Sequence, residues 1–201
     1  MKKILKDTLI LAIITIVSGL LLGLVYMITK EPIAIQNEKT KLAAYNSVFA
    51  ELDSYEEIEE LEEAQKAVKN AGYSAVILNE VVRAFDKDKK ELGLIITVTD
   101  KDGYGGDIKM TVGIDVTGTI TGLEILEINE TAGLGMKAKD ASFRKQYIGI
   151  NADKVEYTKN GKTKDNEIDA ISSATVTTSA VTDGVNGSIT AFKALGGAGD
   201  E

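Results

Sequence analysis

An uncharged stretch of 22 residues, Thr8 to Thr29, is the feature that most constrains what this chain can become. Its side chains are mostly apolar. A helix of that length rises about 33 Å at about 1.5 Å per residue, close to the roughly 30 Å hydrocarbon thickness of a bilayer. A cleaved signal peptide has a shorter apolar core, of about 7–15 residues, and small residues at its cleavage site. The sequence therefore predicts an uncleaved transmembrane signal anchor, with a cleaved peptide as the alternative.

The charges around this stretch predict its orientation. Lys2, Lys3 and Lys6 precede it, and loops rich in lysine tend to stay on the cytoplasmic side. We therefore expect a single-pass protein of the cell membrane with a cytoplasmic N-terminus and an extracytoplasmic main domain. Residues 31–201 carry 30 acidic and 19 basic side chains, a net charge of −11. Binding of nucleic acid needs a basic face, so no nucleic-acid partner is expected.

The composition excludes several kinds of chemistry. Histidine, cysteine and tryptophan are all absent, which excludes disulfides, zinc sites built on Cys or His, iron–sulfur clusters and a Ser-His-Asp triad. A run of glutamates over 56–63 is expected to be a solvated face, because a metal site needs carboxylates that converge from different elements. We expect neither a metal site nor catalytic residues, so any redox chemistry would need an organic cofactor.

Hydrophobic periodicity predicts an α+β fold after the anchor. Apolar residues recur at helical spacing over 37–70, and a closing amphipathic helix is expected over 176–195. A shorter helix is expected over 137–147. Successive β-rich runs separated by turn residues indicate a mainly antiparallel sheet with helices packed on it. These runs cover 75–85, 92–99, 107–116 and 119–128.

The expected organisation has four parts. Residues 1–30 form the N-terminal membrane anchor and residues 31–72 a helical linker region. Residues 73–195 form the main domain, and the glycine-rich residues 196–201 a flexible tail.

Six hydroxyl side chains crowd residues 172–179, where the last predicted helix begins. A helix start exposes unpaired backbone N–H groups and the positive end of the helix dipole, so an anionic phosphate is favoured there. The alternative is simple N-capping, for which serine and threonine are preferred. The composition of the segment alone leaves both interpretations open.

The order of residues in this segment resembles a known motif. Asp169-Ala-Ile-Ser172-Ser173-Ala174-Thr175 is similar to the Asp-x-x-Ser/Thr-Gly-Ala-Thr flavinylation motif of the FMN-binding domain family. In that family the last threonine is joined to the phosphate of FMN by a phosphoester bond. The resemblance implies that FMN is bound covalently to Thr175. Ser173 stands where the family usually has glycine.

A second segment resembles the same family. The residues Glu130-Thr-Ala132-Gly-Leu-Gly135 are similar to the family's Glu-Thr-Pro-Gly-Leu-Gly, with Ala132 in place of proline, and follow a Gly103-Tyr-Gly-Gly turn. With one anchor and about 200 residues, the chain resembles the G subunit of Rnf-type ion-translocating electron transport complexes. The C subunit of the sodium-translocating NADH:quinone reductase shares the domain but is usually longer.

The resemblance implies a flavoprotein that carries electrons within a membrane complex coupling ferredoxin:NAD electron transfer to ion translocation. Such a chain is a component of a translocase rather than a complete enzyme, and a phosphoprotein through its flavin. The implied partners are other membrane subunits and a flavin transferase for maturation. Tyr104, Phe143 and Tyr147 are candidates for stacking on the flavin ring, although ordinary core or surface packing is the favoured interpretation for each. Besides Thr175, the implied cofactor-binding residues are Asp169, Ser172, Ser173, Ala174, Thr177, Thr178, Glu130, Thr131, Gly133, Leu134 and Gly135.

Three other functions stay open at this point. The chain could be a stand-alone extracytoplasmic flavoprotein electron carrier, or the C subunit of a sodium-translocating NADH:quinone reductase. It could also be a non-redox membrane-anchored binding module whose hydroxyl cluster only caps a helix.

Overall fold

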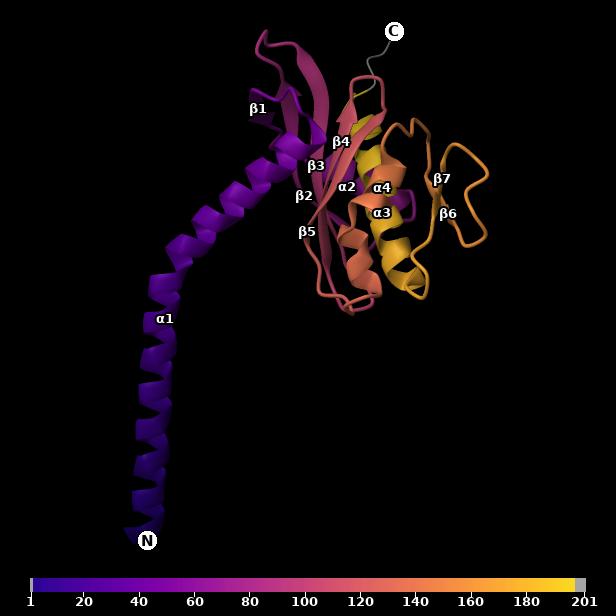
Figure 1. The fold of residues 1–201 in the computed structure, drawn as a ribbon. Helices are drawn as coiled ribbons and strands as arrows, with labels where there is room; N and C mark the ends of the chain where they lie inside the picture. Colours follow the sequence, from indigo (N-terminus) through magenta and orange to yellow (C-terminus); the bar gives the residue numbers. More distant parts are fainter. Residues whose placement is uncertain (1, 198–201) are drawn as a thin grey trace. The chain divides into compact units, whose positions relative to one another are not determined.

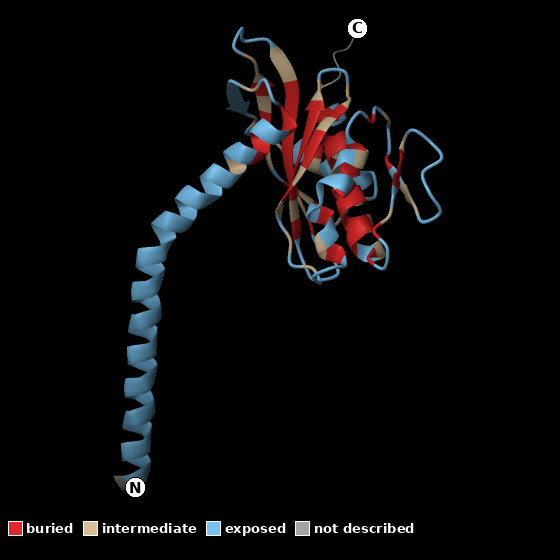
Figure 2. Ribbon diagram, in the orientation of Figure 1, coloured by how far each residue is buried: buried red, intermediate tan, exposed pale blue. Residues whose placement is uncertain are grey.

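The computed structural model describes residues 2–197 and divides the chain after Leu42. Helix α1 (Lys2–Val48) forms the first unit as far as Leu42 and has Pro32 inside it. Residues 3–40 are exposed along their whole length (Figure 2). Within the described residues α1 is the one helix long and apolar enough to cross a membrane. The predicted N-terminal apolar helix is therefore confirmed, whereas residues 198–201 of the predicted tail lie outside the described residues.

The second unit is built around a five-stranded antiparallel sheet (Figure 1). Its strands follow one another in space in the order β1-β2-β3-β4-β5, so each neighbouring pair along the sheet is also consecutive in sequence. The α+β class and the mainly antiparallel sheet predicted from periodicity are confirmed. The strand bounds are β1 Ser54–Glu57, β2 Val76–Phe85, β3 Glu91–Asp100, β4 Ile108–Asp115 and β5 Ile120–Glu127.

Two helices, α2 (Glu62–Asn70) and α4 (Thr175–Ala194), cover one face of the sheet (Figure 1). Alternate residues of β4, such as Met110 and Val112, join the main hydrophobic core beneath α4. This follows from the period of two along a strand, which directs every second side chain to the same face. Between β5 and the last helix lie three short helical segments, η1 (Gly135–Lys139), α3 (Ala141–Arg144) and η2 (Lys145–Tyr147).

The opposite face of the sheet carries a smaller core, formed with the last turns of α1. Tyr45, Val48 and Phe49 pack there against Val82 and Ile95. The helical pattern over 37–70 is broken by strand β1, which pairs with β2 at the edge of the sheet. Glutamates 56 and 57 thus lie in an exposed edge strand rather than a helix. The negative charges suit an edge, because they oppose pairing with another chain.

A second, two-stranded sheet precedes α4 and was not predicted. Strands β6 (Glu156–Thr158) and β7 (Glu167–Asp169) pair in parallel, and β7 leads directly into the hydroxyl-rich segment. Each strand has only three residues, too few for a periodic pattern to be recognised.

Candidate functional site

A pocket of about 470 Å³ lies where α4 begins. Its volume falls in the range of about 300–1,000 Å³ that is common for ligand sites. Three segments form its walls: the β3–β4 loop, the loop after β5, and the start of α4 with the two residues before it. The lining residues are Tyr104, Glu130, Thr131, Leu134, Gly135, Ser173, Ala174, Thr175, Val176 and Thr177.

The pocket brings together eight of the twelve cofactor-binding residues expected from the sequence, all twelve of which are described. The two motifs, about 40 residues apart, thus line one cavity together. The four that do not line it are Asp169, Ser172, Thr178 and Gly133. Val176 lines the pocket and was not expected. Its position beside Thr175 at an exposed helix start was the available signal.

Helix α4 begins at Thr175 with Ala174 as its N-cap residue, and no side chain among the described residues caps it by a hydrogen bond. The hydroxyl of Thr178 is buried. It donates to the carbonyl oxygen of Ala174 at 2.9 Å and accepts from the N–H of Ile171 at 3.1 Å. Thr178 therefore shapes the turn that precedes the helix. The start of α4 keeps the general preference of a helix N-terminus for anions.

Ser173 has a backbone φ of 63°, in the left-handed region. For an L-residue other than glycine this conformation costs about 1–2 kcal/mol, because its Cβ approaches the backbone. The structure thus gives a physical reason why the resembling motif has glycine at this place. Serine adopts the same turn at some cost, and both Ser172 and Ser173 are exposed.

Gly135 allows the two walls of the pocket to approach closely. A Cβ at this position would lie 2.6 Å from the Thr177 Oγ1 and 2.7 Å from the Glu130 Oε2. Any larger residue would push the loop after β5 away from α4. Gly133, two residues earlier, has a φ of 77° and so supplies the left-handed turn that the loop needs.

Asp169 does not line the pocket; its hydrogen bonds hold the segment that leads to it. Its carboxylate accepts a hydrogen bond from the Lys162 N–H at 2.7 Å. Its backbone N–H donates to the side-chain oxygen of Gln146 at 2.7 Å, and its carbonyl accepts from the Gln146 side-chain nitrogen at 3.3 Å. These bonds fix the end of β7 to η2 and so hold the chain that leads to Thr175.

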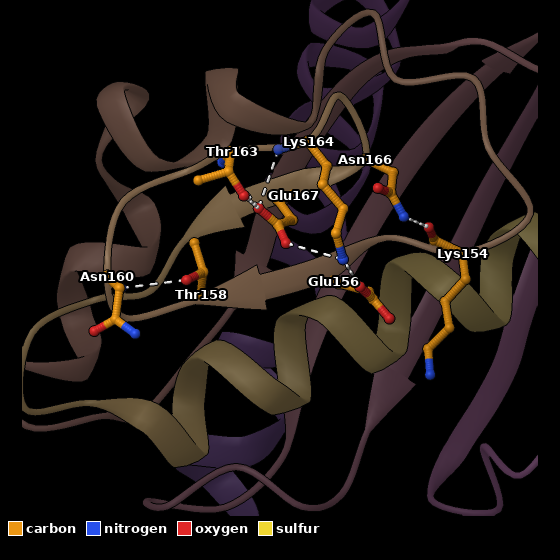
Figure 3. Close-up of polar contacts among 8 residues, drawn as sticks. All are labelled: Lys154, Glu156, Thr158, Asn160, Thr163, Lys164, Asn166 and Glu167. Carbon is orange, nitrogen blue, oxygen red and sulfur yellow. Dashed lines mark hydrogen bonds and ion pairs between the residues drawn. The ribbon is translucent and has the colours of Figure 1, made fainter.

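The connection between β6 and β7 is organised around Glu167 (Figure 3). One carboxylate oxygen accepts from the backbone N–H and the hydroxyl of Thr163, both at 2.9 Å, and from the Lys164 N–H at 3.1 Å. The Lys164 Nζ lies 3.3 Å from both Glu156 and Glu167. These hydrogen bonds, chiefly from Thr163, lower the pKa of Glu167 to about 2.

The three aromatic candidates for ring stacking have different positions. Phe143 and Tyr147 are buried and pack edge to face with ring centroids 5.6 Å apart, so both belong to the core, as ordinary packing predicted for them. The Tyr147 hydroxyl lies 2.9 Å from that of Thr182. Tyr104 is exposed and lines the pocket.

Two protein-family models match this chain. The FMN-binding domain matches residues 103–190, and the RnfG N-terminal region matches residues 1–48. The chain is 30% identical over 198 residues to the G subunit of the Na(+)-translocating ferredoxin:NAD(+) oxidoreductase complex of Acetobacterium woodii, covering 96% of this chain and 94% of the relative. It is 29% identical to the G subunit of the proton-translocating ferredoxin:NAD(+) oxidoreductase complex of Clostridium ljungdahlii, covering 87% and 84% of the two chains.

A solved structure has the same fold. The C subunit of the Na(+)-translocating NADH-quinone reductase from Parabacteroides distasonis superposes with a TM-score of 0.51 at 20% identity, covering 72% of this chain and 77% of that one. Sheet, pocket and family match together define a protein with an N-terminal apolar helix and an FMN-binding domain. The chain belongs to the RnfG family, the G subunits of ion-translocating oxidoreductase complexes.

Proposed function

We propose that this chain is an electron-carrying subunit of a membrane complex that couples ferredoxin:NAD electron transfer to ion translocation. Its similarity to the G subunits of two such complexes covers 96% and 87% of the chain. A lone helix without internal charge offers no path for an ion, so translocation is the work of other subunits. This chain is a carrier within the complex.

The cofactor proposed is FMN, joined through its phosphate to the hydroxyl of Thr175. The observation that carries this proposal is the position of Thr175, the first residue of α4, in the wall of a pocket that also holds the second family motif. When bound, FMN supplies the ability to pass one or two electrons, which no side chain of this cysteine- and histidine-free chain supplies.

The residues around Thr175 suit both parts of such a group. The start of α4 favours the negative phosphate, and the hydroxyl of Thr177, in the same turn and lining the pocket, is a side-chain donor for it. Leu134 and Val176 offer apolar surface for a ring, and Gly135 leaves the space between Glu130 and Thr177 free of a side chain. The pocket thus combines a phosphate-binding end with an apolar wall, the mixture typical of cofactor sites.

We further propose that α1 crosses the membrane with its N-terminus in the cytoplasm and carries the FMN-binding domain on the outer side. The lysines before the apolar stretch support this orientation. A covalent bond would keep the cofactor from diffusing away in that space. Maturation would then require a flavin transferase.

Mass spectrometry of the full chain, produced together with a flavin transferase, tests the attachment. We expect one FMN less one water on the peptide that contains residues 169–179. Thr175→Ala should abolish the modification, whereas Ser179→Ala, which removes a hydroxyl of the same helix that bonds to Asp183 rather than lining the pocket, should leave it in place. An unmodified wild-type chain, or a Thr175→Ala chain that keeps its flavin, would refute the proposal.

Purification of the chain from its native membrane tests the role in a complex. We expect it to co-purify with multi-span membrane subunits in a stable assembly. Recovery of the flavin-bearing chain by itself, under conditions mild enough to preserve membrane complexes, would instead favour a stand-alone electron carrier.

A further inference from the structure

Tyr104 is the most exposed large apolar side chain among described residues 49–197, at 74%. It lies on the rim of the pocket, where Leu134 and Val176 are also exposed, at 40% and 49%. The β3–β4 loop thus carries an aromatic ring that the protein itself does not cover. Exposed apolar side chains gathered around one cavity mark a ligand surface.

The turn that carries Tyr104 is held firmly. The Gly106 N–H donates to the carbonyl oxygen of Gly103 at 3.3 Å, which closes the turn. A Cβ at Gly105 would collide with the carbonyl oxygen of Asn129, so the turn lies directly against the loop after β5. The exposure of Tyr104 therefore does not come from a loosely attached loop.

Glu130 joins this turn to the pocket. Its Oε1 accepts a hydrogen bond from the Gly105 N–H at 3.2 Å, while its Oε2 lies beside Gly135. A bond from a backbone N–H to a carboxylate is stronger than one between neutral groups. One side chain thereby links the residue that follows Tyr104 to the loop that faces α4.

We propose that Tyr104 packs against the ring of the bound flavin, and that Glu130, acting through Gly105, is the positioning residue that holds it there. This inference rests on the proposed function, because it needs FMN in the pocket. Aromatic rings in contact gain about 0.5–1.5 kcal/mol beyond the burial of their surface. Leu134 and Val176 supply the remaining apolar surface of the rim.

Flavin fluorescence tests the contact of Tyr104, because a phenol touching an oxidised flavin ring quenches it by donating an electron to the excited ring. In the full chain with FMN attached, we expect weak fluorescence that rises on unfolding. Tyr104→Ala and Tyr104→Phe should both be several-fold brighter when folded, compared per attached flavin as counted by mass. Tyr55→Phe, the same change at an exposed tyrosine that packs on Tyr45, should stay dark. A Tyr104→Ala protein as dark as wild type would overturn the inference.

Titration with free FMN separates this inference from the covalent bond. For chains produced without a flavin transferase, we expect Tyr104→Ala to weaken FMN binding roughly two- to tenfold and Tyr104→Phe to bind like wild type. Loss of affinity in Tyr104→Ala without any covalent flavin would refute the attachment but support the stacking. If the flavin is attached but Tyr104→Ala changes neither affinity nor fluorescence, the attachment would be supported and the stacking refuted. A chain that neither carries nor binds FMN would overturn both.

Substitutions of Glu130 test its positioning role. Glu130→Ala should brighten the attached flavin as Tyr104→Ala does, whereas Glu130→Gln should stay dark, because its amide oxygen can still accept from the Gly105 N–H. The matched control is Glu127→Ala at the end of β5, where the carboxylate is exposed and pairs with Lys109 at 3.7 Å. If Glu130→Gln is as bright as Glu130→Ala, the charge rather than the hydrogen bond matters, and the positioning role is wrong.

Discussion

Val48, the last residue of α1, lies directly on Gly122 in β5. A Cβ at position 122 would come within 2.7 Å of the Val48 Cα. Gly113, which pairs with Gly122 across the sheet, faces the same valine, and a Cβ there would lie 2.8 Å from the Val48 Cβ. Because these two paired glycines have no side chains, the end of the helix packs directly against the backbone of the sheet. The last turns of α1 are part of the folded domain.

Gly122→Ala should destabilise the domain by about 1–3 kcal/mol, because the new methyl group overpacks a contact that cannot open without moving helix or sheet. Urea unfolding of the full chain in detergent measures the change. Gly19→Ala is the matched control, since a Cβ there meets nothing within 4 Å. Equal stability of Gly122→Ala and wild type would show that the end of α1 is not held against the sheet.

Ser173→Gly should stabilise the protein by up to about 1 kcal/mol, because glycine removes the strain of a left-handed φ and loses part of that gain to its own chain entropy. Thermal unfolding should show a higher midpoint. The adjacent Ser172→Gly should lower the midpoint slightly, because position 172 has no positive φ. If both variants shift the midpoint alike, the backbone of Ser173 is not strained.

Glu167 should make the protein sensitive to acid. Its pKa is about 2 in the folded protein against an ordinary value of 4.5. The carboxylate therefore stabilises the fold fully above about pH 4.5, and this contribution is lost as the pH falls toward 2. Glu167→Gln should lower the urea midpoint at pH 7 and flatten its decline between pH 5 and 3. Glu127→Gln, at an exposed site, should leave the wild-type pH profile unchanged. A Glu167→Gln protein with that same profile would contradict the assignment.

Asp100 should act in the opposite direction. It is 1% exposed, and burial raises its pKa to about 6, above the ordinary value of 3.8. Stability is therefore expected to fall as the pH rises from about 4 to 6, since the folded state must then bury a charge. Asp100→Asn keeps an oxygen for the Asp102 N–H, bonded at 2.7 Å.

The variant Asp100→Asn should be more stable than wild type at pH 7.5, by on the order of 2 kcal/mol, and equally stable at pH 4. Urea unfolding at the two pH values measures the difference. Asp140→Asn, at an exposed position, should change neither. A gain of the same size at pH 4 and pH 7.5 would show that the titration of Asp100 is not its cause.

The elements predicted with success are those whose side chains repeat over many residues. The β-rich run 107–116 became β4 and the amphipathic pattern 176–195 became α4, each within one residue at either end. Strand β1 was missed because its four residues are all exposed, so no alternation of burial marks it. The short strands β6 and β7 depend on each other and on Glu167, a contact that local pattern does not reveal.

The candidate site also has a part that could be predicted from the sequence and a part that could not. The two family motifs could be recognised from residue order, and their separation in sequence gave no measure of their distance in space. Phe143 and Tyr104 illustrate the limit: both are aromatic residues near a motif, yet one is buried against Tyr147 and the other is exposed at the pocket. Burial depends on how the layers pack, which lies beyond the reach of spacing along the chain.

The sequence alone determined the apolar length of the anchor, the alternation of the sheet and the order of hydroxyl residues before the last helix, because each is a property of neighbours along the chain. Tertiary structure alone decided that Glu130 and Thr177 meet across Gly135, that Ser173 turns left-handed and that Val48 rests on Gly122. Those relationships arise where segments distant in sequence are pressed together by burial of a shared core, and close packing then dictates which residues fit.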